Sequence, residues 1–398
     1  TMTKEYFLAN YCPDRHGTNC SKWDILPEKY GDASLTSMWV ADMDFKAPEA
    51  VVKALRDKVD FGVYGYSLTR KEYYDVFIDW EKKYHGWQVE KDWIRFTPGV
   101  VTGIFWCIHM LTQKGDSVIM NMPVYYPFHH AVEDTGRTLI YSELVNTDGV
   151  YTIDFADFEE KIVKNNVKAY ILCSPHNPVG RVWREEELKK LLSICQKYGV
   201  IVISDEIHHD LIIGDHPHIP TASVAGGKYA DIVICLTAAS KTFNLAGMKN
   251  SFVIIPGEEL RRKFDELVRN LHEDTGNMLG YYAIEAAYRE GRAWLDTVIG
   301  IIRDNYAYTA KRLQEELPKA KLSPLEGTYL AWLDLSGYLG KTGEAEMKDF
   351  VQSRARLAVD YGEWFGAGGR GFIRLNLATT PQWVEKAVGG LVEAARSL

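Results

Sequence analysis

The chain has few of the features that mark secreted, membrane or nucleic-acid-binding proteins. Its 398 residues include only six cysteines, which form neither a CxxC pair nor a zinc-type spacing. The longest uncharged stretch, 96–113, contains proline, glycine and polar residues, so it predicts a buried helix start and not a membrane span. No apolar leader opens the chain, so we expect no signal peptide. We therefore expect a reduced, cytoplasmic, globular protein without a membrane partner.

An excess of basic residues is also missing. The net charge is −8 at pH 7, whereas a protein that binds nucleic acid through phosphates needs a basic face. We therefore expect no nucleic-acid partner. Apolar residues at 46% and charged residues at 25% are typical of a folded globular protein, and the length allows two or three domains.

Short apolar runs alternate with amphipathic segments through the middle of the chain. In 184–198, for example, apolar residues recur at three- and four-residue steps, as in a helix. Apolar strands separated by helices indicate a parallel sheet covered on both faces. We therefore expect a large α/β domain over 48–285. Its expected strands are 93–97, 117–122, 167–173, 200–204, 232–236 and 251–255.

The pattern changes from about residue 299. A long polar helix is expected at 305–317, followed by a strand at 328–333, a further helix, a glycine-rich turn at 366–371, a strand at 372–377 and a C-terminal helix. This irregular order predicts a smaller α+β domain over 286–398. We expect residues 1–47 to pack against it, which makes the small domain discontinuous.

Candidate site residues follow the predicted strands, because ligands of a doubly wound sheet bind beyond the carboxyl ends of its strands. Gly99, Val100 and Val101 follow the first strand and open a helix, which suits a phosphate. Asn177 lies between two prolines, each of which restricts the residue before it. Asp205 follows an apolar strand, so we expect a half-buried carboxylate that needs a cationic or N–H partner.

Two further groups each admit two interpretations. Lys241 follows a strand and small residues, where a lysine can lose its charge and act as a nucleophile, although alone it is more simply a solvated lysine. His208, His209 and Asp210 could bind a metal. However, adjacent histidines on a helix point about 100° apart, so we expect no metal.

Together these residues match the needs of one cofactor. Pyridoxal 5′-phosphate (PLP) requires a phosphate cradle, a donor to its phenolate oxygen, a carboxylate for its pyridine nitrogen and a lysine for a Schiff base. The chain offers these in the order glycine turn, Asn177, Asp205 and Lys241. The sequence therefore predicts a PLP enzyme.

Longer motifs resemble the fold type I PLP enzymes, namely Ser174–Gly180, Ser204–His208 and Ser240–Gly247. Within this group the chain is most similar to the C–S β-lyases of the MalY/PatB (cystathionine β-lyase) family, which is class-II aminotransferase-like. The likeness covers nearly the whole chain and implies an aspartate aminotransferase-like fold, a PLP cofactor and a homodimer. Its further segments are Arg15–Asp24, Met38–Phe45, Tyr64–Tyr66, Met122–Pro127 and Arg374–Ala378.

The resemblance implies a role for each site residue. Lys241 would hold the cofactor and take the proton from the substrate Cα, Asp205 would keep the pyridine nitrogen protonated, and Arg374 would clamp the substrate carboxylate. Asn177 would bind the phenolate oxygen, Tyr125 would stack on the ring unless it is a core aromatic, and His208 would lie at the ring edge. The phosphate would be bound by Val100, Val101, Ser240 or Thr237, and the neighbouring subunit's Tyr64.

Three positions are not fixed by the motifs. Lys249 stands eight residues after Lys241, where many aminotransferases carry an arginine, so its phosphate role is open. His209 and the segment 39–40 would influence substrate choice, although Trp39 is as easily a packing residue.

The activity implied by the resemblance is a β-elimination. L-cystathionine, L-cysteine or another S-substituted amino acid would give a thiol, pyruvate and ammonia. An aminotransferase of class I or II uses the same residues and stays open as an alternative. A regulatory, protein-binding role on the same fold is the second alternative.

Overall fold

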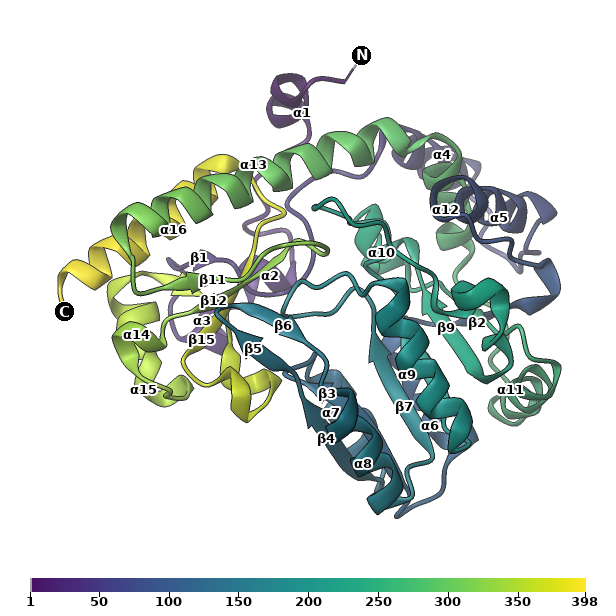
Figure 1. Cartoon of the computed structure of the whole chain (residues 1–398). Coiled ribbons are helices and arrows are strands. Elements are labelled where there is room, and N and C mark those ends of the chain that lie inside the picture. The colour runs from purple at the N-terminus through teal and green to yellow at the C-terminus, as the bar shows by residue number, and fades with distance from the viewer. Residues whose placement is uncertain (1) are drawn as a thin grey trace.

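A seven-stranded sheet organises the computed structural model, which describes residues 2–398 (Figure 1). The strand order is β2-β10-β9-β8-β7-β3-β4, and only β10 runs antiparallel to its neighbours. The predicted α/β fold with a mainly parallel sheet is therefore confirmed. The strands are β2 (Ile94–Thr97), β3 (Ser117–Met122), β4 (Thr138–Glu143), β7 (Ala169–Cys173), β8 (Ile201–Asp205), β9 (Val233–Thr237) and β10 (Ser251–Ile254).

Helices cover both faces of this sheet. Successive residues of a strand point to opposite faces, so each strand contributes side chains to both layers. In β7, Tyr170 and Leu172 belong to one core cluster, whereas Ile171 and Cys173 belong to the other. Both faces are apolar, which explains why the strands read as continuous apolar runs. One cluster includes residues of α4 (Glu49–Phe61), α5 (Lys71–His85), α8 (Phe155–Asn165), α9 (Glu185–Lys197) and α12 (Met278–Glu290), and the other includes residues of α6 (Val100–Leu111), α7 (Pro127–Glu133) and α11 (Glu258–Leu271).

A second, antiparallel sheet has the strand order β11-β12-β15-β14. The long helix α13 (Arg292–Glu316) packs beside α16 (Pro381–Arg396) in this part of the molecule (Figure 1). The other elements here are β11 (Lys321–Leu322), β12 (Leu330–Asp334), α14 (Ser336–Leu339), α15 (Glu344–Lys348), β13 (Leu357–Ala358), β14 (Asp360–Tyr361) and β15 (Phe372–Asn376).

The N-terminal segment contacts the C-terminal part. Its strand β1 (Thr36–Ser37) pairs with β13, and Trp23 packs on Trp383 with ring centroids 4.7 Å apart. The domain division at residues 47/48 and 285/286 stays a prediction. The remaining elements are α1 (Lys4–Asn10), α2 (Ser21–Asp24), α3 (Leu26–Tyr30), the hairpin β5 (Val145–Thr147) and β6 (Val150–Thr152), and α10 (Ala239–Thr242).

Most of the expected strands agree with the structure within two residues, but three expectations were wrong or incomplete. The helix expected at 305–317 is α13, which begins at Arg292. Strand β4 and the hairpin β5–β6 were not predicted. Asp205 is the last residue of β8 and is buried, not half-buried after the strand.

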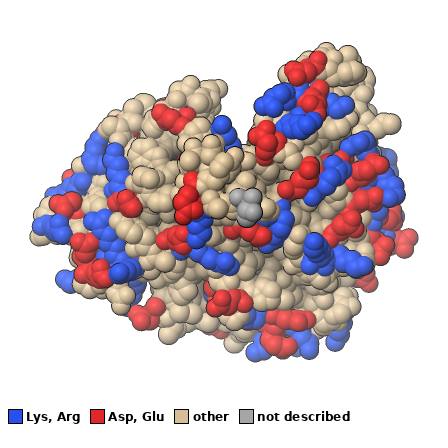
Figure 2. All heavy atoms as spheres, turned by 90° about the horizontal axis from the view of Figure 1, so that it is seen from above, with Lys and Arg blue, Asp and Glu red and all other residues tan. Residues whose placement is uncertain are grey.

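The outer surface carries mixed charge. Figure 2 shows basic and acidic side chains interspersed over the face seen from above. Nearby opposite charges cancel each other's long-range field at ordinary ionic strength. Within residues 2–398, no helix is both long and apolar enough to cross a membrane.

Candidate active site

Side chains from several strand ends meet around a cavity of about 280 Å³. Strands β2, β7, β8 and β9 are parallel, so their carboxyl ends share one edge of the sheet. Most of the predicted site residues line this cavity: Lys241, Asp205, Asn177, Tyr125, Val100, Val101, His208 and Ser240.

The start of α6 forms one wall of the cavity. Gly99 precedes the helix with φ +125°, a conformation that favours glycine, and the first N–H groups of a helix have no partner within it. Inside α6, a Cβ at Gly103 would lie 2.4 Å from Leu236 Cδ2, so glycine lets the helix approach β9 closely. Ser240 and Lys249 line the same cavity. This end of the cavity is therefore suited to an anion.

Asp205 is a buried carboxylate at the cavity. Its Oδ1 accepts a hydrogen bond from the Ile207 backbone N–H at 3.1 Å. Burial raises the pKa of Asp205 to about 7, although the Ile207 N–H and the charge of Lys241 oppose this. Among residues 2–398 no cation lies in ion-pair contact with it. A protonated ring nitrogen would supply the partner that this carboxylate lacks.

Lys241 brings an amine into the cavity from α10. Its Nζ donates a hydrogen bond to the backbone carbonyl of Ala41 at 2.6 Å. Burial lowers the pKa of Lys241 to about 8, Asp42 and Asp205 oppose that shift, and Arg374 adds to it. A lysine with such a pKa is partly uncharged near neutral pH and can act as a nucleophile.

Asn177 and Arg374 are joined by a hydrogen bond. The Arg374 Nη1 donates to the Asn177 Oδ1 at 3.1 Å, which leaves the amide nitrogen of Asn177 for another partner. Arg374 is itself buried, does not line the cavity, and pairs with Asp360. The backbone N–H of Tyr125 donates to the Asn177 carbonyl at 3.1 Å, so this segment is held against the asparagine.

Besides Arg374, two further predicted residues lie outside the cavity of this chain. The hydroxyl of Thr237 donates to the Glu206 carbonyl at 3.1 Å and lies 3.0 Å from His209 Nδ1. The side chain of Tyr64 is exposed, and its hydroxyl donates to the Val59 carbonyl at 2.7 Å. The phosphate roles of both residues stay predictions.

His208 and His209 point to different places, as expected for neighbouring residues. His208 lines the cavity, and its Nδ1 is buried without a hydrogen-bond partner among residues 2–398. His209 instead lies 2.6 Å from Glu81, outside the cavity, so it has no contact there through which to influence substrate choice. Trp39 is buried and donates to the Lys22 carbonyl, which favours its packing interpretation.

Sequence reasoning missed several residues of the site. Cys173 ends β7 directly opposite Asp205 in β8, so the strand-end argument that found Asp205 could have found it. Ala41 lies within the motif Met38–Phe45, but that motif assigned it no role in the site. Lys249, whose role was left open, lines the cavity.

The donor set of the cavity fits PLP. It combines a buried carboxylate without a cationic partner, a lysine of lowered pKa, an asparagine amide and the N–H groups at the start of a helix. Those are the groups that a pyridine nitrogen, an aldehyde, a phenolic oxygen and a phosphate require.

Comparison with known proteins agrees with this geometry. Residues 36–391 match the family described as aminotransferase class I and II. Cystathionine beta-lyase PatB of Bacillus subtilis is 41% identical over 91% of this chain and 93% of its own length. Protein MalY of Escherichia coli is 32% identical over 97% of this chain and 98% of its own length. The crystal structure of cystalysin from Treponema denticola contains PLP. It has a TM-score of 0.92 and 36% sequence identity, covering 97% of this chain and 98% of the cystalysin chain. An aspartate aminotransferase of Pyrococcus horikoshii is more distant, at 23% identity.

Proposed function

We propose, since the chain belongs to the aminotransferase class I and II family, that it is a PLP-dependent carbon–sulfur β-lyase. The family is PLP-dependent, so the cofactor and family predicted from the sequence are confirmed. The observation that carries the proposal is that Lys241, Asp205 and Asn177 meet in one cavity of a chain whose relative PatB is named a cystathionine beta-lyase.

The proposal assigns each end of the cofactor to residues of the cavity. When bound, PLP supplies an electron sink for negative charge that develops at the substrate Cα. Lys241 would hold it covalently through Nζ, Asp205 would keep a proton on the ring nitrogen, and the Asn177 amide would donate to the phenolic oxygen. The phosphate would lie at the start of α6 beside Ser240 and Lys249, with Tyr125 and His208 along the ring.

Other residues would act on the substrate. The fork of Arg374 suits an α-carboxylate, because a guanidinium can bind both carboxylate oxygens. The lowered pKa of Lys241 allows its Nζ to take the Cα proton near neutral pH. Loss of that proton and of the Cβ–sulfur bond would release a thiol, and water would convert the remainder to pyruvate and ammonia.

A homodimer is part of the proposal. Tyr64 is 60% exposed, and the neighbouring side chains of Phe61, Val63, Tyr66 and Leu68 are also exposed. A contiguous exposed segment of apolar and aromatic side chains is typical of an interface between subunits. We infer that this segment packs on a second copy, where Tyr64 reaches the neighbouring cavity.

Placement in the cytoplasm rests on the cysteines. Cys12, Cys20, Cys107, Cys173, Cys195 and Cys235 are all free thiols. Free thiols are the usual state of cysteines in a reducing compartment.

An aminotransferase is the second candidate, because enzymes of that name belong to the same family. It would use the same cavity but return the proton to the cofactor without breaking the Cβ–sulfur bond. The regulatory, protein-binding alternative stays a prediction.

One assay distinguishes the two enzymes. Purified holoenzyme is incubated with L-cystathionine in the absence of any α-keto acid, and pyruvate and ammonia are measured with time. A lyase releases both over many turnovers, whereas Lys241→Ala releases neither. At most one turnover, restored by added α-keto acid, would identify an aminotransferase and refute the lyase.

A further inference from the structure

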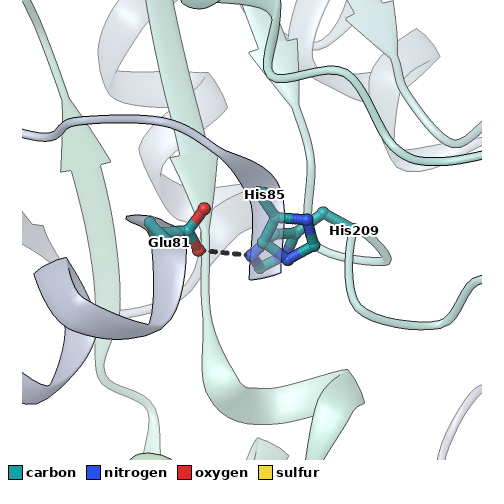
Figure 3. A group of neighbouring side chains, drawn as sticks. All are labelled: Glu81, His85 and His209. Atoms are coloured by element: carbon teal, nitrogen blue, oxygen red, sulfur yellow. Dashed lines mark hydrogen bonds and ion pairs between the residues drawn. The ribbon is translucent and has the colours of Figure 1, made fainter. Parts of the chain in front are cut away.

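A buried cluster of histidines and carboxylates lies outside the active-site cavity. Glu81 and His85 are four residues apart on α5, so they share one face of the helix. His209 comes from the turn after β8, and Figure 3 shows its ring overlapping that of His85 beside the Glu81 carboxylate. One ligand atom from each of the three residues lies within 4.8 Å of the others.

The hydrogen-bond directions leave a place for a cation between His209 and Glu81. The Thr237 hydroxyl donates to a carbonyl, so its oxygen accepts from the Nδ1–H of His209. In a neutral imidazole the lone pair then lies on Nε2. This Nε2 faces Glu81 Oε1 at 2.6 Å. Two lone pairs at that distance are joined by a proton, and a metal ion could take the place of that proton if the contact opened.

The surrounding charges also favour a cation. The carboxylates of Glu81, Asp210 and Glu206 are all buried. The histidines that face them are His85, 2.6 Å from Asp210, and His218, 2.8 Å from Glu206. With neutral imidazoles the cluster has an excess of negative charge, which is costly in a buried place.

Nearby arginines do not supply that charge. Arg292 pairs with Asp296, and the Arg303 guanidinium donates to the Ile213 carbonyl. Both arginines line a separate cavity of about 420 Å³ that also contacts His85, Asp210 and His218. This cavity shares no lining residue with the active-site cavity and gives an ion a route to the cluster.

We propose that Glu81, His85 and His209 form a binding site for a divalent first-row transition metal ion, with Asp210 as a fourth ligand. Imidazole and carboxylate donors of this kind suit zinc and its neighbours better than calcium or magnesium.

Part of the geometry already matches what such an ion requires. Tetrahedral zinc holds nitrogen and oxygen ligands about 3.3 Å from one another. His209 Nε2 already lies 3.5 Å from Asp210 Oδ2, whereas the contacts of His209 with Glu81 and of His85 with Asp210 must each open from 2.6 Å. Second partners orient the ligands, as in established metal sites. Asp210 accepts hydrogen bonds from Trp80 and from Thr242.

Direct binding of zinc tests the proposal without substrate. Holoenzyme is freed of metal with a chelator, dialysed against micromolar zinc, and analysed for bound zinc per chain. We expect one zinc per chain, and cobalt in its place should give the visible absorption bands of a four-coordinate ion. Zinc should also raise the melting temperature of the wild-type protein, because a ligand that binds only the folded state stabilises it.

Two variants and one control locate the site. Glu81→Gln and His209→Gln should each weaken zinc binding by about 100-fold. The control is His130→Gln, which removes a histidine–aspartate pair that is exposed, with His130 Nδ1 3.1 Å from Asp134 Oδ2. It should bind zinc as the wild type does.

Other results would overturn the site. If the wild type binds no zinc and its melting temperature does not change, a proton occupies the place between His209 and Glu81. Unchanged binding in both variants would put the zinc elsewhere. Neither measurement uses substrate or turnover. The metal site can therefore be refuted while the lyase proposal stands, and the lyase proposal can be refuted while the metal site stands.

Discussion

Arg374 and Asp360 form a buried ion pair across two neighbouring strands. The Arg374 Nη2 lies 2.8 Å from the Asp360 Oδ2, and the two side chains are 1% and 0% exposed. The residues are register partners in β15 and β14, so the backbone itself places the carboxylate beside the guanidinium. Asp360 therefore fixes the orientation of the arginine to which we assign the substrate carboxylate.

Removing the charge of Asp360 should destabilise the protein strongly. In Asp360→Asn the Arg374 guanidinium stays buried without a counter-charge, and we expect the free energy of unfolding to fall by about 3–5 kcal/mol. Denaturant unfolding measures this. The matched control is Glu363→Gln, which breaks the half-exposed pair of Glu363 with Arg370 and should cost at most about 1 kcal/mol. Equal effects of the two substitutions would contradict the argument.

Attachment of PLP to the apoenzyme should depend on pH through Lys241. Only the uncharged amine attacks an aldehyde, and burial lowers the pKa of Lys241 from 10.5 to about 8. The attachment rate should therefore rise with pH and level off above about 8. Stopped-flow absorbance after addition of PLP at a series of pH values gives the midpoint. A midpoint near 10.5 would show that the lysine is not perturbed.

Asp205 should make the apoenzyme less stable as the pH rises. Its pKa is about 7 in the folded protein and about 4 in an unfolded chain, so the folded state keeps a proton that the unfolded state loses. The stability is therefore fully present below about pH 4 and is lost as the pH rises through about 7. Asp205→Asn should remove this decline, making the apoprotein more stable than wild type above pH 7 by up to about 4 kcal/mol.

Denaturation of both apoproteins at several pH values measures the effect, and parallel curves would contradict it. Turnover should respond in the opposite direction. Without the carboxylate the ring nitrogen loses its partner, so the holoenzyme of Asp205→Asn should lose about 100-fold in rate.

Gly103→Ala should loosen the packing of α6 on the sheet. The added methyl group would lie 2.4 Å from Leu236 Cδ2 and 2.9 Å from Thr97 Oγ1, so a side chain or the helix must move. We expect a loss of about 1–3 kcal/mol in unfolding free energy. Gly247→Ala is the control, because its Cβ would meet no atom within 4 Å. Thermal unfolding of both variants decides the point.

Mixed dimers test whether Tyr64 acts in the active-site cavity of the neighbouring subunit. If this tyrosine serves the neighbouring cavity, a dimer of one Tyr64→Phe subunit and one Lys241→Ala subunit has one site with both native residues. Mixing the two weakened variants under exchange conditions should then restore activity, which a pyruvate assay detects. No restoration, although light scattering shows mixed dimers, would mean that Tyr64 acts in its own chain or not at all.

The sequence predicted the parts of the site that local patterns determine. Asp205, Asn177 and Lys241 each come shortly after or at the end of an apolar strand, so parallel strands bring them together. Contacts between residues far apart in the sequence could not be predicted, because no local pattern records them. Glu81 and His209, for example, are 128 positions apart and meet only in the folded chain.

The start of α13, in contrast, could have been predicted. Within 292–304 the helix buries Trp294, Leu295, Val298, Ile299, Ile301 and Ile302, which recur at three- and four-residue steps and so share one broad face. This is the period of an amphipathic helix, and it extends back from residue 305 towards Arg292.

The reversed direction of β10 has a consequence for the two lysines of the cavity. Because β10 runs opposite to β9, the residues that enter β10 lie at the same edge as those that leave β9. Lys249 precedes β10 and Lys241 follows β9, and both line the cavity. The segment 242–248 therefore joins the two lysines within the connection between these adjacent strands, which lie about 4.8 Å apart. Lengthening or shortening it by one residue would change the separation of the two amines.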